Sequence, residues 1–98
     1  MPILVRNLEH ESDPPTCGCG TWIRHWENGS NKKKGNCCAY ACFEKADRGG
    51  HVQKRKVGDD SWYIIPICAK CNRKLGEEYY VNDDTFFVPV GKNSRCKP

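Results

Sequence analysis

The sequence predicts a small α+β domain that depends on bound metal for its stability, because its apolar core is small. The chain has 98 residues, which corresponds to one domain near the lower size limit for a self-sufficient hydrophobic core. Only 38% of the residues are hydrophobic, whereas eight are cysteines. A chain of this kind usually needs disulfides or a metal ion to hold its fold.

The redox environment decides whether the cysteines form disulfides or bind a metal ion. Residues 1–9 contain no apolar run long enough for a secretory signal, and no later stretch is long enough to cross a membrane. We therefore expect a cytoplasmic or nuclear protein without a membrane partner, in which paired cysteines stay reduced and bind metal. The alternative is a disulfide-stabilised secreted domain whose signal has been removed.

The N-terminal half of the sequence predicts an extended leading segment and one helix. Residues 1–15 are expected to be extended or partly disordered, because prolines and acidic residues interrupt them, and a single domain then occupies residues 16–98. Thr21 can cap a short helix that runs to about Asn28, with Gly29 in the stop position. Apolar residues on one face of this helix indicate that it packs across the core.

The C-terminal half predicts several short strands. Residues 50–57 and 61–67 have the composition of a β-hairpin around a turn at residues 58–60. Two further short strands are expected at residues 79–81 and 86–88, because each is rich in aromatic and β-branched side chains.

Two groups of cysteines flank the predicted hairpin. Cys68 and Cys71 have the two-residue spacing of zinc ligands, at the point where the second strand leads into a helix. The upstream pair is Cys42 with either Cys37 or Cys38. Neighbouring residues of an extended segment point to opposite sides, so only one of these two can bind the same ion, and we favour Cys37.

These elements have the connectivity of a treble clef: a cysteine turn, a β-hairpin, a second cysteine turn and a short helix. The helix is expected over residues 68–75, where Gly76 ends it, and the whole core covers about residues 37–76. We therefore predict a zinc-stabilised treble clef with an extra N-terminal helix and C-terminal short strands.

Other potential ligands lie outside this core. A second zinc site would use Cys17, Cys19, His25 and Cys96. Cys17 and Cys19 are separated by one residue, a less common spacing for zinc, and Cys96 stands near the end of the chain. A disulfide from Cys17 or Cys19 to Cys96, or free thiols, therefore remain alternatives to a second ion.

The segment after the hairpin resembles a known family. Cys68-Ala-Lys-Cys71-Asn72-Arg73-Lys74-Leu75-Gly76, preceded by an apolar strand, is similar to the end of HNH endonuclease domains, which are treble clefs of this size. The resemblance implies that His51 is a general base on a hairpin strand. It also implies that Asn72 is a ligand to a catalytic Mg²⁺ or Mn²⁺ ion.

The catalytic motif of that family is incomplete here. Gly50 stands where an acidic residue usually precedes the histidine and helps to hold the metal. No asparagine lies in the turn at residues 57–60 to orient His51. His51 is therefore open to three interpretations: a general base, a zinc ligand, or a structural or surface residue.

Charge and aromatic content indicate binding partners. The net charge is +4, and the candidate phosphate contacts are Lys54, Lys56, Arg73 and Lys74. Coverage of the core is expected of Tyr79, Tyr80, Phe86 and Phe87, with a stacking surface for single strands as the alternative. We expect an HNH-like zinc module that binds nucleic acid or a protein without catalysis, with a metal-dependent endonuclease as the alternative. The sequence does not indicate an oligomeric state.

Overall fold

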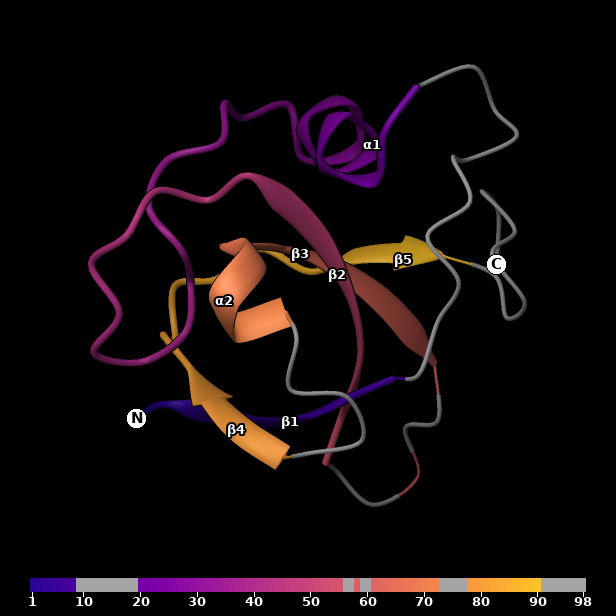
Figure 1. Cartoon of the computed structure of the whole chain (residues 1–98). Helices are drawn as coiled ribbons and strands as arrows, with labels where there is room; N and C mark the ends of the chain where they lie inside the picture. Colours follow the sequence, from indigo (N-terminus) through magenta and orange to yellow (C-terminus); the bar gives the residue numbers. More distant parts are fainter. Residues whose placement is uncertain (9–19, 56–57, 59–60, 73–77, 91–98) are drawn as a thin grey trace.

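A computed structural model describes residues 1–8, 20–55, 58, 61–72 and 78–90. In these residues the chain forms one five-stranded antiparallel sheet, in the order β4-β1-β2-β3-β5, and two helices (Figure 1). The strands are β1 (Ile3–Asn7), β2 (Arg48–Lys54), β3 (Trp62–Ile67), β4 (Glu78–Val81) and β5 (Val88–Val90), and the helices are α1 (Trp22–Ser30) and α2 (Ala69–Asn72).

The predicted β-hairpin is the centre of the sheet. β2 and β3 pair antiparallel, with His51 opposite Ile64. The hairpin arms differ from the expected ranges, since β2 starts at Arg48 and ends at Lys54. Of the predicted turn, only Gly58 lies within the described residues, and its φ of 84° is a conformation that glycine adopts without strain.

The first residues of the chain belong to the sheet and not to a lead outside the domain. β1 pairs with both β2 and β4, and Val5 in its middle is completely buried. Proline and acidic residues on either side of this strand made it look irregular in sequence. The pairing with residues about 50 and 75 positions away is a non-local contact that local composition does not reveal.

The two C-terminal strands lie at opposite edges of the sheet. β4 covers the predicted residues 79–81 and pairs with β1, while β5 pairs with β3. β5 begins at Val88, so the expected strand at residues 86–88 is displaced toward the C-terminus. Phe86 instead contacts helix α1, since its carbonyl accepts a hydrogen bond from the Trp26 indole at 2.8 Å.

Helix α1 starts where the sequence predicts and ends later. Thr21 is its N-cap, and the hydroxyl of Thr21 accepts a hydrogen bond from the Arg24 amide at 3.2 Å. The helix continues to Ser30 and ends on Asn31, which has a left-handed φ of 57°. The expected stop at Gly29 is therefore wrong. A side chain at Gly29 would approach Val88 to 2.6 Å, so this glycine permits close packing and does not end the helix.

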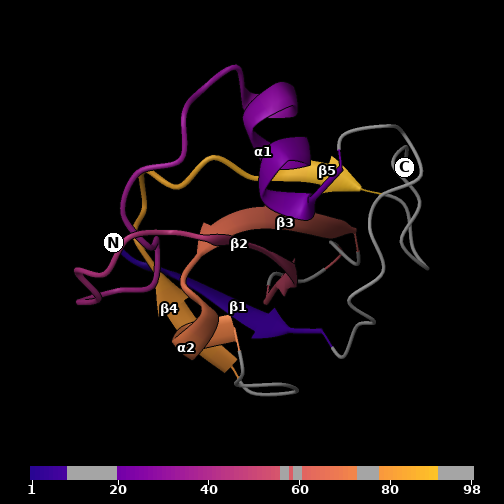
Figure 2. The same ribbon diagram turned by 45° about the horizontal axis from the view of Figure 1, so that its top comes forward.

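The sheet carries a different cluster on each face. On one face α1 packs Trp22, Ile23 and Trp26 against the sheet residues Ile64, Val88 and Val90. Figure 2 shows α1 over β3 and β5, with α2 on the other side near β4 and β1. A second cluster is formed by Val5, Cys38, Val52, Ile65 and Val81. Residues 73–75 of the predicted second helix lie outside the described residues.

Neither helix in the described part of the chain has the length and apolar character that a bilayer crossing requires.

Candidate metal centre

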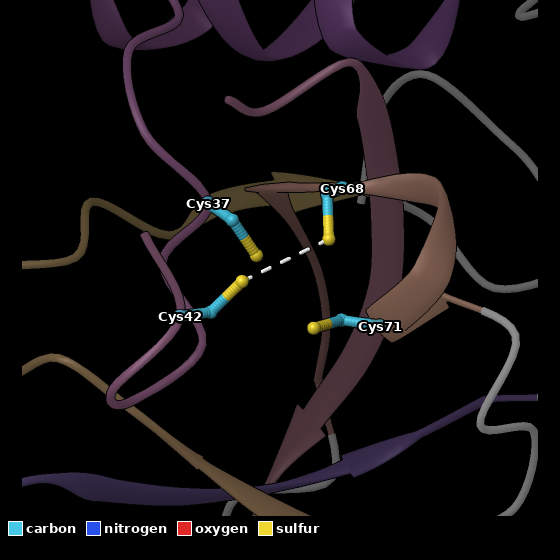
Figure 3. A group of neighbouring side chains, drawn as sticks. All are labelled: Cys37, Cys42, Cys68 and Cys71. Atoms are coloured by element: carbon cyan, nitrogen blue, oxygen red, sulfur yellow. Dashed lines mark hydrogen bonds between the residues drawn. The ribbon is translucent and has the colours of Figure 1, made fainter. Parts of the chain in front are cut away.

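Four cysteines from two separate segments meet at one end of the sheet. Cys37 and Cys42 come from the loop between α1 and β2, Cys68 follows β3, and Cys71 lies in α2. Their sulfur atoms all lie within 4.8 Å of one another, and the Cys42 and Cys68 sulfurs are 3.9 Å apart. Figure 3 shows the four side chains pointing toward a common centre. This arrangement confirms the grouping of cysteines that the sequence predicts.

The upstream pair is held by a tight loop that folds back on itself. The Cys37 amide donates to the Glu44 carbonyl at 2.7 Å, which closes the loop at its base. Within the loop the Cys42 amide donates to the Ala39 carbonyl at 3.0 Å, and Ala41 has a left-handed φ of 64°. The sharp reversal aims both sulfurs in the same direction.

The downstream pair is positioned by the start of α2. The Asn72 amide donates to the Cys68 carbonyl at 2.9 Å, which brings Cys71 back beside Cys68 after one turn. The Ala69 amide donates to the carboxylate of Asp47 at 2.9 Å, so a side chain caps this turn. Asp47 also donates its own amide to the Ile67 carbonyl at 3.1 Å, which ties the start of β2 to the end of β3.

The sulfurs also lie close to backbone amides. Burial raises the pKa of Cys37 to about 11, although the amides of Cys68 and Ala39 act in the opposite direction. At Cys68 burial likewise raises the pKa. The Cys71 amide and the neighbouring thiols outweigh that effect, so the pKa falls below its ordinary value. Amides aimed at sulfur stabilise thiolates, which are the metal-binding form of cysteine.

Cys38 is separate from this centre, as expected for the neighbour of a ligand in an extended segment. Its side chain is buried with Val5 and Val52, and burial raises its pKa to about 12. Its amide donates to the Pro66 carbonyl at 3.0 Å, so it anchors the loop to β3. Cys37, and not Cys38, therefore belongs to the cluster.

The two positions that the HNH resemblance singles out are on different sides of β2: His51 is a residue of this strand and points toward α1, whereas Asn72 lies against its opposite face. A side chain at Gly49 would lie 2.4 Å from the Trp22 backbone, whereas one at Gly50 would lie 3.1 Å from the Asn72 side-chain oxygen. Position 50 thus faces Asn72, as an acidic metal ligand there would, but glycine supplies no ligand atom.

His51 lies with Gly49 on the α1 side of β2. Its side chain is only 5% exposed, and its ring meets that of Trp22 edge-on at 4.6 Å. It is not part of the cysteine cluster. In the described residues His51 is therefore a buried residue beneath α1, consistent with the structural interpretation.

The proposed second metal site falls largely outside the described residues. Cys17, Cys19 and Cys96 all lie there, and His25 is the one described member. His25 is buried on α1, with its ring 5.2 Å from that of Trp22. Burial lowers its pKa against the opposing effect of a hydrogen bond with the Pro89 backbone.

The candidate phosphate contacts are only partly described. The Lys54 ammonium lies over the rings of Tyr63 and Phe87, at 4.9 and 4.5 Å from their centres. It therefore interacts with aromatic faces at the border of the second cluster. The other three candidates, Lys56, Arg73 and Lys74, lie outside the described residues.

The four C-terminal aromatic residues divide into two kinds. Tyr79 and Phe87 pack against the core clusters, while Tyr80 and Phe86 are exposed by 54% and 42%. The expected coverage of the core therefore holds for Tyr79 and Phe87, and not for Tyr80 and Phe86. Side chains along β4 point alternately to the two faces of the sheet, which explains why Tyr79 is covered and Tyr80 is exposed.

Two exposed aromatic residues beside the metal centre were missed from sequence. Tyr40 and Phe43, in the cysteine loop, are exposed by 61% and 88%. The Tyr40 amide donates to the Tyr80 carbonyl at 2.9 Å, so this loop extends the edge of β4. A hollow of about 400 Å³ lies there, lined by Ala39, Tyr40, Ala41, Cys42, Cys71, Tyr79 and Tyr80. The signal was the position of Tyr40 between Cys38 and Cys42 and of Phe43 directly after Cys42, where little chain is available to cover them.

Comparison of the chain with known protein families, with curated proteins and with solved structures gave no match.

Proposed function

We propose that this chain is a zinc-binding module of the treble-clef type that acts by binding a nucleic acid or protein partner, and not by catalysis. The observation that carries the proposal is the convergence of four sulfurs from two separate turns within 4.8 Å of one another. Four thiolates in a tetrahedron favour zinc or iron, and zinc is the usual ion of isolated sites with this ligand set.

The order of elements supports the treble-clef interpretation. The loop that carries Cys37 and Cys42 precedes the β2–β3 hairpin, and Cys68 and Cys71 lead into α2. A metal ion at this point would join the start and the end of the hairpin. The five described cysteines are all free thiols, which is the state that metal binding requires and that a disulfide framework lacks.

A structural role for the ion follows from the ligand number. Catalytic zinc sites keep one position open for water or substrate, whereas four cysteines fill the tetrahedron. The residues implied for a separate catalytic metal offer little support for an endonuclease. Gly50 has no ligand atom to share with Asn72, and His51 is covered by Trp22.

The proposed partner surface is the aromatic border of the metal centre. Tyr40, Phe43 and Tyr80 are exposed and lie on segments that the cysteine loop brings together. Exposed aromatic side chains stack on unpaired bases and also anchor protein interfaces, so both partner classes remain within the proposal. A cytoplasmic or nuclear location is part of the same proposal, because thiols stay reduced there.

Metal analysis of the reduced protein tests the zinc assignment, with at least one zinc ion per chain expected. A plasmid-nicking assay with Mg²⁺ or Mn²⁺, comparing wild type with His51→Ala, tests the absence of catalysis. Metal-dependent cleavage that the variant lacks would overturn the non-catalytic assignment in favour of an endonuclease. Titration of a labelled single-stranded oligonucleotide with wild type and Tyr40→Ala then asks whether the aromatic border binds bases.

A further inference from the structure

The hollow beside the metal centre is bordered by two of the four cysteines. Cys42 and Cys71 line it and are partly exposed, whereas Cys37 and Cys68 are buried, with 1% and 6% exposure. The hollow has a volume of about 400 Å³, which is enough to admit one long side chain. A group that enters it therefore meets the metal centre through the sulfurs of Cys42 and Cys71.

The electrostatic character of the hollow follows from the groups around it. The negative charge of four thiolates exceeds the positive charge of one zinc ion, so an occupied centre is anionic. Among the described residues that line the hollow, none carries a positive charge. Lys70, the neighbour of Cys71 in sequence, is exposed and is not one of the lining residues. The negative charge of an occupied centre is therefore not neutralised by the lining of the hollow, and a partly buried charge is screened less than an exposed one.

The remaining lining residues add to the preference for a cation. Three of them are tyrosines, at positions 40, 79 and 80, and the other two are the small residues Ala39 and Ala41. Aromatic side chains attract cations, and a cation next to an ionised sulfur also makes a charge-assisted hydrogen bond. A phosphate group in the same hollow would instead be repelled by the anionic centre. Charge complementarity thus favours a positively charged group here over a nucleic-acid backbone.

We propose that the hollow binds an arginine side chain of a protein partner, whose guanidinium group donates to the sulfurs of Cys42 and Cys71. This inference rests on the proposed function, because the negative charge belongs to the zinc-bound centre, and it names the partner of that same site. Arginine fits better than lysine for two reasons. Its planar head is weakly hydrated and stacks on aromatic side chains, and its several N–H groups can reach two acceptors at once.

The first test needs only the wild-type protein. Zinc-loaded, ¹⁵N-labelled protein is titrated with the capped tripeptide Gly-Arg-Gly and followed by NMR, and the control peptide carries citrulline, which has nearly the same shape as arginine and no charge. We expect the arginine peptide to shift the amide signals of Ala41, Cys42 and Cys71, and the citrulline peptide to bind about tenfold more weakly. Equal binding of the two peptides, or no shift of these signals, would overturn the proposal. A single-stranded thymidine oligonucleotide that shifts the same signals would overturn it too, since the hollow would then accept a phosphate backbone.

Two variants at one exposed position separate the effect of charge from that of shape. Ala41 lines the hollow and is exposed, so it tolerates a longer side chain. We expect Ala41→Lys to weaken binding of the arginine peptide roughly fivefold and Ala41→Glu to strengthen it by a similar factor, because each adds one unit charge near the guanidinium. Gly35→Lys is the control, since it adds the same charge at an exposed residue that does not line this hollow, and it should leave binding unchanged. A change of the same sign in both Ala41 variants would contradict the proposal.

Zinc content, measured on the same samples, distinguishes failure of this inference from failure of the proposed function. A reduced chain that holds no zinc contradicts the proposed function, and with it the negative charge on which the inference depends. A zinc-loaded chain that binds the arginine and citrulline peptides equally contradicts the inference alone.

Discussion

The two ends of the β2–β3 hairpin region are stabilised in different ways. Under α1, Trp22, Trp26 and Ile64 belong to a cluster of large apolar side chains. At the cysteine end the buried residues are Cys37, Ala39, Ile67 and Cys68, of which only one is a large aliphatic side chain. The first region is held by burial of large apolar side chains, whereas the second buries few of them, and in the proposed function a metal ion stabilises it in place of a core.

The largest expected effect concerns the adjacent residues Cys37 and Cys38. Cys37→Ala removes a ligand, and because zinc binding contributes on the order of 10 kcal/mol to folding in small zinc domains, this variant should lose the metal and its cooperative unfolding. Cys38→Ala should keep zinc and lose roughly 1 kcal/mol of stability, as for deletion of one buried atom. Metal content and thermal unfolding of the two variants give the comparison. Equal zinc content in both would contradict the ligand assignment.

The next effect tests the apolar end. Trp26→Ala should reduce the free energy of unfolding by about 3–5 kcal/mol, because it removes a large buried side chain and its hydrogen bond to Phe86. In cobalt-substituted protein, the metal spectrum of the folded fraction should match that of wild type. Phe43→Ala, at an 88% exposed position, is the control and should leave the unfolding temperature unchanged. If Trp26→Ala alters the metal spectrum, the two ends are not independent.

A smaller effect on stability tests how closely α1 packs against β2. Gly49→Ala places a methyl group 2.4 Å from the Trp22 backbone, so the helix must shift, at a cost of about 1–3 kcal/mol. Gly35→Ala is the matched control, because nothing lies within 4 Å of its added carbon. Chemical denaturation of both variants should show a loss for Gly49→Ala alone. A Gly49→Ala protein as stable as wild type would mean that α1 does not lie this close to β2.

The smallest expected effect is at the helix cap. Thr21→Ala removes the acceptor of the Arg24 amide and should cost about 1 kcal/mol. Thr21→Ser keeps a hydroxyl and should retain most of the stability, as measured by urea denaturation. Equal losses in the two variants would show that the hydroxyl is not the stabilising group.

The sequence was most informative where the determining contacts are short-range. The Thr21 cap, the β2–β3 hairpin and the two-residue spacing of Cys68 and Cys71 all follow from neighbouring residues. The separation of Cys37 from Cys38 follows from the alternation of an extended chain. These local rules were enough to predict the cysteine cluster.

The parts that could not be predicted depend on long-range pairing. β1 joins the sheet by pairing with β2 and β4, and no local pattern shows which strands will accept it. Likewise, Gly29 has the composition of a helix stop, yet its role is set by contact with Val88, which lies 59 positions away. The exposure of His51 depends on α1 covering β2, so its burial was not visible in sequence.

X-ray absorption spectroscopy of the reduced protein with one zinc ion bound is the most direct test of the central claim. Zinc held by Cys37, Cys42, Cys68 and Cys71 should show four sulfur neighbours at about 2.3 Å and no nitrogen or oxygen in the first shell. A first shell that contains nitrogen or oxygen, or a reduced protein that keeps its fold without any metal, would contradict the account.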